Sequence, residues 1–86
     1  MMEEKYLGKI SHYFSHLGVG AMRIEEGTLK PGDKIHIKGH TTDLIQTVET
    51  IESEHKHIEE AKAGDDIGFK VADHVREHDM VYKIIE

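Results

Sequence analysis

Hydrophobic and polar residues alternate along most of the chain, in the two-residue period that is typical of half-buried β-strands. In the clearest example, Ile35 and Ile37 point to one side of a strand, whereas His36 and Lys38 point to the other. The pattern predicts six strands, at residues 6–15, 18–24, 34–38, 44–51, 67–71 and 80–85.

The first and fourth of these segments carry more detailed expectations. In the first, Ile10, His12 and Phe14 share one face, and Tyr13 falls on the opposite, outward face. In the fourth, the apolar positions change parity, so we expect a β-bulge near Glu49-Thr50.

Two similar turns precede the third and fifth strands. The first is Pro31-Gly32-Asp33, and the second centres on Gly64-Asp65. Proline pre-sets φ, glycine gives the backbone freedom at a reversal, and an aspartate side chain can accept hydrogen bonds from turn amides. We interpret both turns as structural rather than chemical.

Six short strands separated by Gly, Pro and Asp predict an all-β fold, specifically a small closed six-stranded antiparallel β-barrel. Closure would remove the unpaired strand edges. Two polar segments resist a strand interpretation: Glu52–Lys62 is a helical turn or a solvated loop, and Asp73–Asp79 is a loop that could contain one helical turn. We expect one domain over residues 1–86, with a core from about 6 to 85.

The composition narrows the possible chemistry. With 86 residues, of which 37% are hydrophobic, the chain can fill one modest core but cannot enclose a large ligand cavity. The absence of cysteine excludes disulfides, thiolate zinc sites and thiol catalysis. Ser11, Ser15 and Ser53 lack the context of a nucleophile elbow. We therefore predict a protein without enzymatic activity or cofactor.

The sequence shows neither a signal-peptide pattern nor an apolar run of the ~20 residues that a membrane-spanning helix needs. We expect a cytoplasmic location and no membrane partner.

The net charge of −6 opposes non-specific nucleic-acid binding, which normally requires a basic surface. Any contact with RNA should therefore be local. The candidate binding surface consists of five residues: the outward groups Lys38 and His40, beside the loop that carries His55, Lys56 and His57.

The eight histidines are a second candidate for chemistry. Three pairs are four residues apart, namely His12/His16, His36/His40 and His74/His78. Metal binding needs several ligands that converge on one point, and most of these residues lie on predicted strands or turns. We expect dispersed surface histidines without a dedicated metal site. Opportunistic zinc or nickel binding is conceivable only at His74/His78, if that loop forms a helical turn.

The motif Gly-Thr-Leu-Lys-Pro-Gly-Asp at residues 27–33, together with Ala-Gly-Asp-Asp-Ile-Gly at 63–68, resembles the second domain of translational GTPases. That domain is the β-barrel after the G domain in elongation factor Tu, and the resemblance extends from Leu7 to Ile84. The phosphate loop ending in Gly-Lys-Ser/Thr is missing, so the resemblance does not imply nucleotide binding. A fainter resemblance, through residues 41–49, is to the barrel appended to some collagenase-like peptidases.

Three functions follow from these patterns. The resemblance implies a non-enzymatic binding module that associates with tRNA, rRNA or the ribosome. The acidic charge and the missing G domain favour an alternative, a protein-docking barrel for a separately encoded partner such as a peptidase. The third is opportunistic metal binding through surface histidines.

Overall fold

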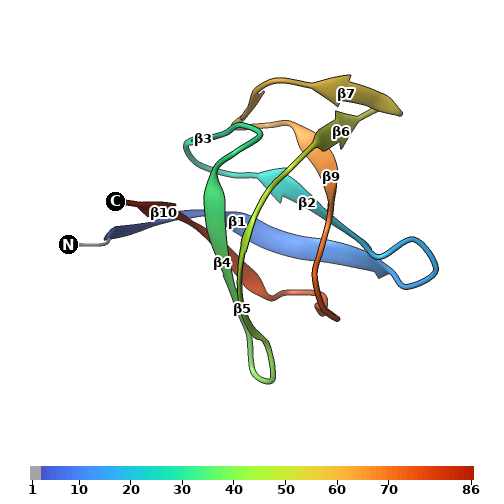
Figure 1. Cartoon of the computed structure of the whole chain (residues 1–86), viewed down its shortest axis with the longest axis vertical. Coiled ribbons are helices and arrows are strands. Elements are labelled where there is room, and N and C mark those ends of the chain that lie inside the picture. The colour runs from blue at the N-terminus through green and yellow to red at the C-terminus, as the bar shows by residue number, and fades with distance from the viewer. Residues whose placement is uncertain (1–2) are drawn as a thin grey trace.

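The computed structural model describes residues 3–86, so Met1 and Met2 of the predicted domain lie outside the described residues. These residues form β-strands joined by turns, and the strands curve around one interior (Figure 1). The strands are β1 (Glu3–Phe14), β2 (Val19–Ile24), β3 (Thr28–Leu29), β4 (Lys34–Lys38), β5 (Asp43–Thr47), β6 (Ile51–Ser53), β7 (Lys56–Ile58), β8 (Ala61–Lys62), β9 (Asp66–Lys70) and β10 (Met80–Ile85). Within the described part of the chain, no helix could cross a membrane.

Eight strands form one antiparallel sheet in the order β5-β4-β10-β1-β2-β9-β6-β7, and β3 pairs with β8 in a second, two-stranded sheet. The predicted all-β antiparallel class is confirmed. Closure into a six-stranded barrel stays a prediction, because hydrogen-bonded pairing within residues 3–86 begins at β5 and ends at β7 without joining them. The pairing of β1 with β10 places Glu3 opposite Ile85, so the two ends of the described chain lie side by side.

Each of the six predicted strands has a counterpart, but the fourth is divided. β5 ends at Thr47 and β6 begins at Ile51, so the expected irregularity near Glu49-Thr50 separates two strands. The interpretation of Glu52–Lys62 as a helical turn or loop was wrong, since most of this segment forms the β6–β7 hairpin and β8. Glu54 and His55 have φ of 52° and 65°, the positive values that a two-residue type I′ turn requires. That turn normally contains Asn or Gly, and Glu54-His55 contains neither, so residue type did not reveal it.

The loop before β10 is also non-helical. Asp79 N–H donates to Arg76 C=O at 3.1 Å, which forms a tight turn, and Val75 is fully buried. Two backbone hydrogen bonds, His78 N–H to Ile10 C=O and Ile10 N–H to Asp79 C=O, both 2.8 Å, attach the loop to β1. The loop is therefore held in place by an apolar anchor and by strand-like pairing.

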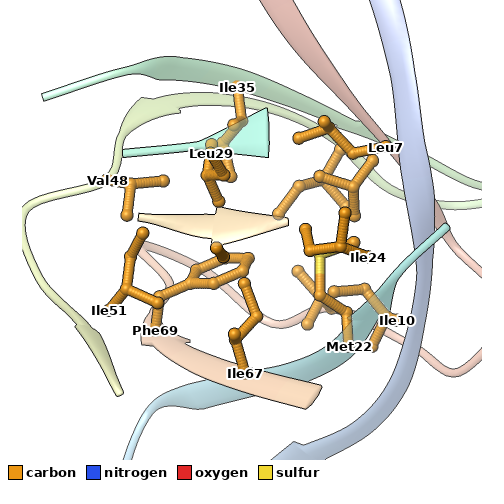
Figure 2. Packing of buried hydrophobic residues seen from close by; sticks show 14 residues of the cluster. Leu7, Ile10, Met22, Ile24, Leu29, Ile35, Val48, Ile51, Ile67 and Phe69 are labelled. Carbon is orange, nitrogen blue, oxygen red and sulfur yellow. The ribbon is translucent and has the colours of Figure 1, made fainter. Parts of the chain in front are cut away.

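One hydrophobic core fills the interior, and Figure 2 shows its side chains converging from strands that are far apart in the sequence. Its buried members are Leu7, Ile10, Met22, Ile24, Leu29, Ile35, Ile37, Val48, Ile51, Ala61, Ile67, Phe69, Val75 and Val81. Strict alternation places Ile35 and Ile37 of β4 in this core, as predicted.

Strand β1 departs from strict alternation. Its register shifts between Tyr6 and Gly8 against β10, and between Ile10 and His12 against β2. Each shift inserts one extra residue into β1, and the side chains that follow it therefore change to the opposite face of the strand. As a result Tyr13 packs against the core and Phe14 is 44% exposed, so the predicted faces of these two residues were wrong.

The two Gly-Asp turns are built in the same way. Asp33 accepts a hydrogen bond from Lys30 N–H at 2.8 Å, and Asp65 accepts one from Lys62 N–H at 2.9 Å. The glycines of the two turns have φ of 98° and 99°, a region that favours glycine. Strands β3 and β8 each lead into one of these turns, so their pairing in the second sheet places the two turns side by side. The predicted structural role of both aspartates is confirmed.

A side-chain amide connects β5 with the chain just after β9. Gln46 Nε2 donates to Lys70 C=O at 2.8 Å, and Ala72 N–H donates to Gln46 Oε1 at 2.7 Å. One glutamine thus supplies a donor and an acceptor to the backbone, as a residue of a neighbouring strand would. The bridge spans the side of the fold where β5 has no strand partner other than β4.

An imidazole joins three strands on the outer side of β4. His36 Nδ1 lies 2.7 Å from Glu4 Oε2 of β1, and His36 Nε2 lies 2.5 Å from Asp43 Oδ1 of β5. Its side chain is only 11% exposed. Burial acts to lower the pKa of His36, but hydrogen bonds and charge attraction from Glu4 and Asp43 outweigh it and raise the pKa above 6.5. Only the imidazolium can donate from both nitrogens at once.

We predict that Gln46→Ala lowers the free energy of unfolding by about 1 kcal/mol, because two backbone groups lose their partner and only water replaces it. Urea unfolding measures this loss. The control is Thr47→Ala at the neighbouring exposed position of β5, which should change stability much less. Equal stabilities of the two variants would show that the bridge contributes nothing.

We predict that the stabilisation by His36 depends on pH. Because the folded-state pKa lies above the ordinary 6.5, the contribution is fully present below about pH 6.5 and is lost as pH rises through the folded-state pKa. The stability difference between wild type and His36→Gln should therefore be larger at about pH 6 than at about pH 9. The control is His16→Gln at an exposed position. A difference for His36→Gln that is constant, or that grows with pH, contradicts the expectation.

Candidate functional site

The five predicted surface residues fall into two separate groups. Lys38 ends β4 and His40 lies in the β4–β5 turn, whereas His55, Lys56 and His57 belong to the β6–β7 hairpin. Figure 1 shows this turn and this hairpin at opposite ends of the molecule. The structure therefore keeps the residues of each group together but does not join the two groups into one surface.

The first group lines a surface hollow of about 560 Å³, which we call the basic hollow. Its lining residues are Lys38, Gly39, His40, Arg76, Glu77, His78, Asp79, Met80 and Tyr82. The β4–β5 turn forms one side of it, and the loop before β10 forms the other. Arg76, His78 and Tyr82 were missing from the predicted binding surface. The loop that carries Arg76 and His78, and strand β10 that carries Tyr82, meet β4 only in the folded structure.

A close approach of the Gly39 backbone to the Asp79 side chain fixes the shape of the basic hollow. Asp79 is 4% exposed, and its carboxylate accepts a hydrogen bond from Arg76 N–H at 2.9 Å. A Cβ atom at Gly39 would lie 1.8 Å from Asp79 Oδ1, so only glycine fits there. Arg76 Nε donates to Thr41 Oγ1 of the β4–β5 turn at 2.9 Å. This hydrogen bond connects the loop to the turn.

Two cations, Lys38 and Arg76, and two carboxylates, Glu77 and Asp79, line the hollow. Lys38 Nζ lies 5.6 Å from the centre of the Tyr82 ring, within range of a cation–π interaction. Glu77 is directed to His12, with 3.8 Å between Oε2 and Nδ1. Within residues 3–86, Lys38 and Arg76 form no ion pair with a carboxylate. Lys38 and Arg76 are thus two cations of the hollow without a carboxylate partner, and two carboxylates, Glu77 and Asp79, line the same hollow.

The surroundings of the second group are different. A hollow of about 340 Å³ beside the β6–β7 hairpin includes His55 but also Glu52, Glu54 and Asp66. His57 Nε2 lies 3.1 Å from Glu52 Oε2, so one of the basic groups faces a carboxylate. This environment disfavours phosphate groups. Binding by His55, Lys56 and His57 stays a prediction.

An exposed ion pair borders that second hollow. Arg23 Nε and Nη2 donate to the two carboxylate oxygens of Asp66, both at 2.9 Å. The paired hydrogen bonds raise the pKa of Arg23 and lower the pKa of Asp66 from their ordinary values. This arrangement ties β2 to β9 and leaves neither group available for a ligand.

The described residues offer few side chains that could bind a metal ion or act as a nucleophile. The described residues contain no group of three or more His, Asp or Glu side chains arranged to hold a metal ion. His74 packs against Tyr13, with 4.5 Å between ring centres and an angle of 45° between the rings, and the helical turn that a His74/His78 site would require does not form. Ser11 and Ser53 both donate to backbone carbonyls, of Ala21 and Asp66. Neither hydroxyl is hydrogen-bonded to a base.

Two curated relatives place this fold in larger proteins. The chain is 43% identical over 82 residues to a collagenase of Porphyromonas gingivalis, a match that covers 94% of the chain and 23% of the collagenase. It is 46% identical over 59 residues to elongation factor 1-alpha of Nanoarchaeum equitans, which covers 63% of the chain and 14% of the factor. The chain thus spans less than a quarter of the length of these relatives.

A solved structure has the same fold. The C-terminal domain of a Geobacillus thermoleovorans protein assigned to the U32 peptidases superposes with a TM-score of 0.85, over 92% of this chain and 91% of that one. The two sequences are 21% identical, so this likeness concerns the fold alone.

The family model described as elongation factor Tu domain 2 matches residues 18–78, which include both Gly-Asp turns and most of the basic hollow. The resemblance to the second domain of translational GTPases is thereby confirmed. The chain belongs to the elongation factor Tu domain 2 family.

Proposed function

We propose that the chain is a non-catalytic accessory domain that docks to the catalytic domain of a collagenase-like peptidase, in the same polypeptide or a separate one. The observation that carries this proposal is the 43% identity to the collagenase over 94% of the chain. The likeness of the fold to the C-terminal domain of a U32 peptidase supports it. This is the alternative that the acidic charge favoured, and we give it preference over a role in translation.

The surface chemistry is compatible with docking rather than catalysis. The core is filled by side chains, and the hollows of the described residues lie on the surface. Large apolar side chains are exposed at several places, namely Phe14, Leu17, Ile45, Met80 and Ile85. Such side chains contribute apolar area to a protein–protein interface. A cytoplasmic location remains part of the proposal.

Association with tRNA, rRNA or the ribosome is the second candidate function. It draws support from the identity to elongation factor 1-alpha and from Lys38 and Arg76 of the basic hollow, two cations without a carboxylate partner within residues 3–86. The net charge of −6 weighs against it, because phosphate contacts gain affinity from a basic surface.

We predict that the chain forms a one-to-one complex with a collagenase-like catalytic domain from the same organism, prepared without its own barrel. Size-exclusion chromatography with light scattering, at micromolar protein and with nuclease present, detects the complex. The matched control is domain 2 of elongation factor Tu from that organism, which has the same fold and should not bind.

A missing complex, or equal binding by the control barrel, contradicts the docking proposal. In that case titration with tRNA across a salt series tests the second candidate. Binding to phosphates must weaken as salt rises, because fewer counterions are released.

A further inference from the structure

We propose that the hollow beside the β6–β7 hairpin binds an arginine side chain of the peptidase partner. This hollow has a volume of about 340 Å³, and we call it the hairpin hollow. Its lining comes from β1, β2, β9 and β6, which are consecutive in the sheet (Figure 1), and from the β6–β7 turn. The identity of the partner rests on the proposed function, but the chemistry of the ligand rests on the hairpin hollow itself.

The hairpin hollow carries an excess of negative charge. Glu52, Glu54 and Asp66 line it, whereas no lysine or arginine of residues 3–86 does. Arg23, bound to Asp66 from outside the lining, compensates one of these three carboxylates, so two formal negative charges remain with the histidines counted neutral. A local excess of one sign, in a protein whose net charge of −6 has the same sign, attracts a cation.

The two remaining carboxylates are accessible to a donor. Glu52 and Glu54 are both exposed. Glu54 forms no ion pair within residues 3–86. Glu52 Oε2 lies 3.1 Å from His57 Nε2, and this imidazole compensates the charge of Glu52 only when it is protonated. Either carboxylate can therefore accept hydrogen bonds from a cationic side chain.

Apolar side chains distinguish the hairpin hollow from an ordinary acidic surface. Val19, Ala21 and Ile67 line it together with the carboxylates. Phe14, which the register shift of β1 turns out of the core, is 44% exposed and also lines it. An aromatic ring attracts a cation to its face, and the methylene groups of a long side chain pack on apolar surface. The hollow thus suits a ligand that is cationic at its end and apolar along its length.

This combination favours arginine over lysine and over a metal ion. A guanidinium stacks on an aromatic ring, is weakly hydrated and binds a carboxylate through two parallel hydrogen bonds. The lysine ammonium is a strongly hydrated point charge, so it loses more hydration on entering a partly apolar site. A metal ion needs several converging ligands, and the described part of the chain holds no group of three His, Asp or Glu side chains arranged in that way.

The backbone of the β6–β7 turn supports a role for its side chains. Glu54 and His55 have φ of 52° and 65°, in a region that residues other than Gly, Asn and Asp rarely adopt. An Asn-Gly pair would form the same turn with less strain. Residues that keep a strained conformation are enriched at binding sites. We therefore attribute the glutamate at position 54 to the hollow that it lines.

The first test titrates triarginine, trilysine and triglutamate, all with blocked ends, into the isotope-labelled protein at low salt and follows amide shifts by NMR. Triarginine should shift the amides of residues 52–55 and 66–68 and should bind more tightly than trilysine. The variant Glu52→Gln/Glu54→Gln should bind triarginine on the order of tenfold more weakly. The charge-matched control is Glu26→Gln/Glu59→Gln, at two exposed positions outside the hollow, and it should bind like wild type.

The second test separates binding from stability at the turn. The variant Glu54→Asn/His55→Gly should have a higher melting temperature than wild type, because Asn-Gly is favoured in this turn. The same variant should bind triarginine several-fold more weakly, because it loses one carboxylate of the hollow. A purely structural role of Glu54 predicts a change in melting temperature with unchanged binding.

The proposal is overturned if triarginine shifts no amide of the hairpin hollow, if trilysine or triglutamate binds there as tightly, or if the two glutamine double variants weaken binding equally. Unchanged binding by Glu54→Asn/His55→Gly also overturns it. The amide spectra of the free variants show whether each retains the fold.

Complex formation with the peptidase catalytic domain is measured separately. A complex that Glu52→Gln/Glu54→Gln leaves intact overturns this inference alone. A complex that is missing with wild type overturns the docking proposal, and the peptide titration still decides the chemistry of the hairpin hollow.

Discussion

The double pairing of β1, with β10 on one side and β2 on the other, is the constraint on which the rest of the fold depends. Leu7, Ile10 and Tyr13 of this strand all contribute to the core, although they are three residues apart. A strand with strict alternation would send every second one of them to the solvent. The two register shifts of β1 turn each of them inward, and the strong local twist of bulged strands helps the sheet to curve.

The same strand organises the basic hollow. Ile10 receives one hydrogen bond from the loop before β10 and donates another, next to the second register shift. The loop then brings Arg76 to the β4–β5 turn, where Thr41 accepts its hydrogen bond. The position of Arg76 beside the β4–β5 turn is therefore a consequence of how one irregular strand pairs, because residues 76 and 41 are far apart in the sequence.

The sequence was most informative where local chemistry determines the backbone. The alternation in β4, and the two Gly-Asp turns with their aspartate hydrogen bonds, were predicted correctly. The outward face of Phe14 was missed, because a bulge is set by the partner strands and leaves no mark on residue parity. The β6–β7 hairpin was missed because Glu54-His55 occupies a turn that usually contains Asn or Gly. Lys38 and His40 were predicted as candidates, but Arg76 and His78 join them only through contacts between distant segments.

The pairing of Glu3 with Ile85 has a consequence for how this fold is used in larger proteins. Because both ends leave the molecule at one place, the domain can be attached to a host chain, or inserted into a loop of one, without stretching or reshaping either partner. The surfaces far from that junction stay free in every such arrangement. Modular reuse of this kind explains how one small fold can recur in a collagenase and in an elongation factor.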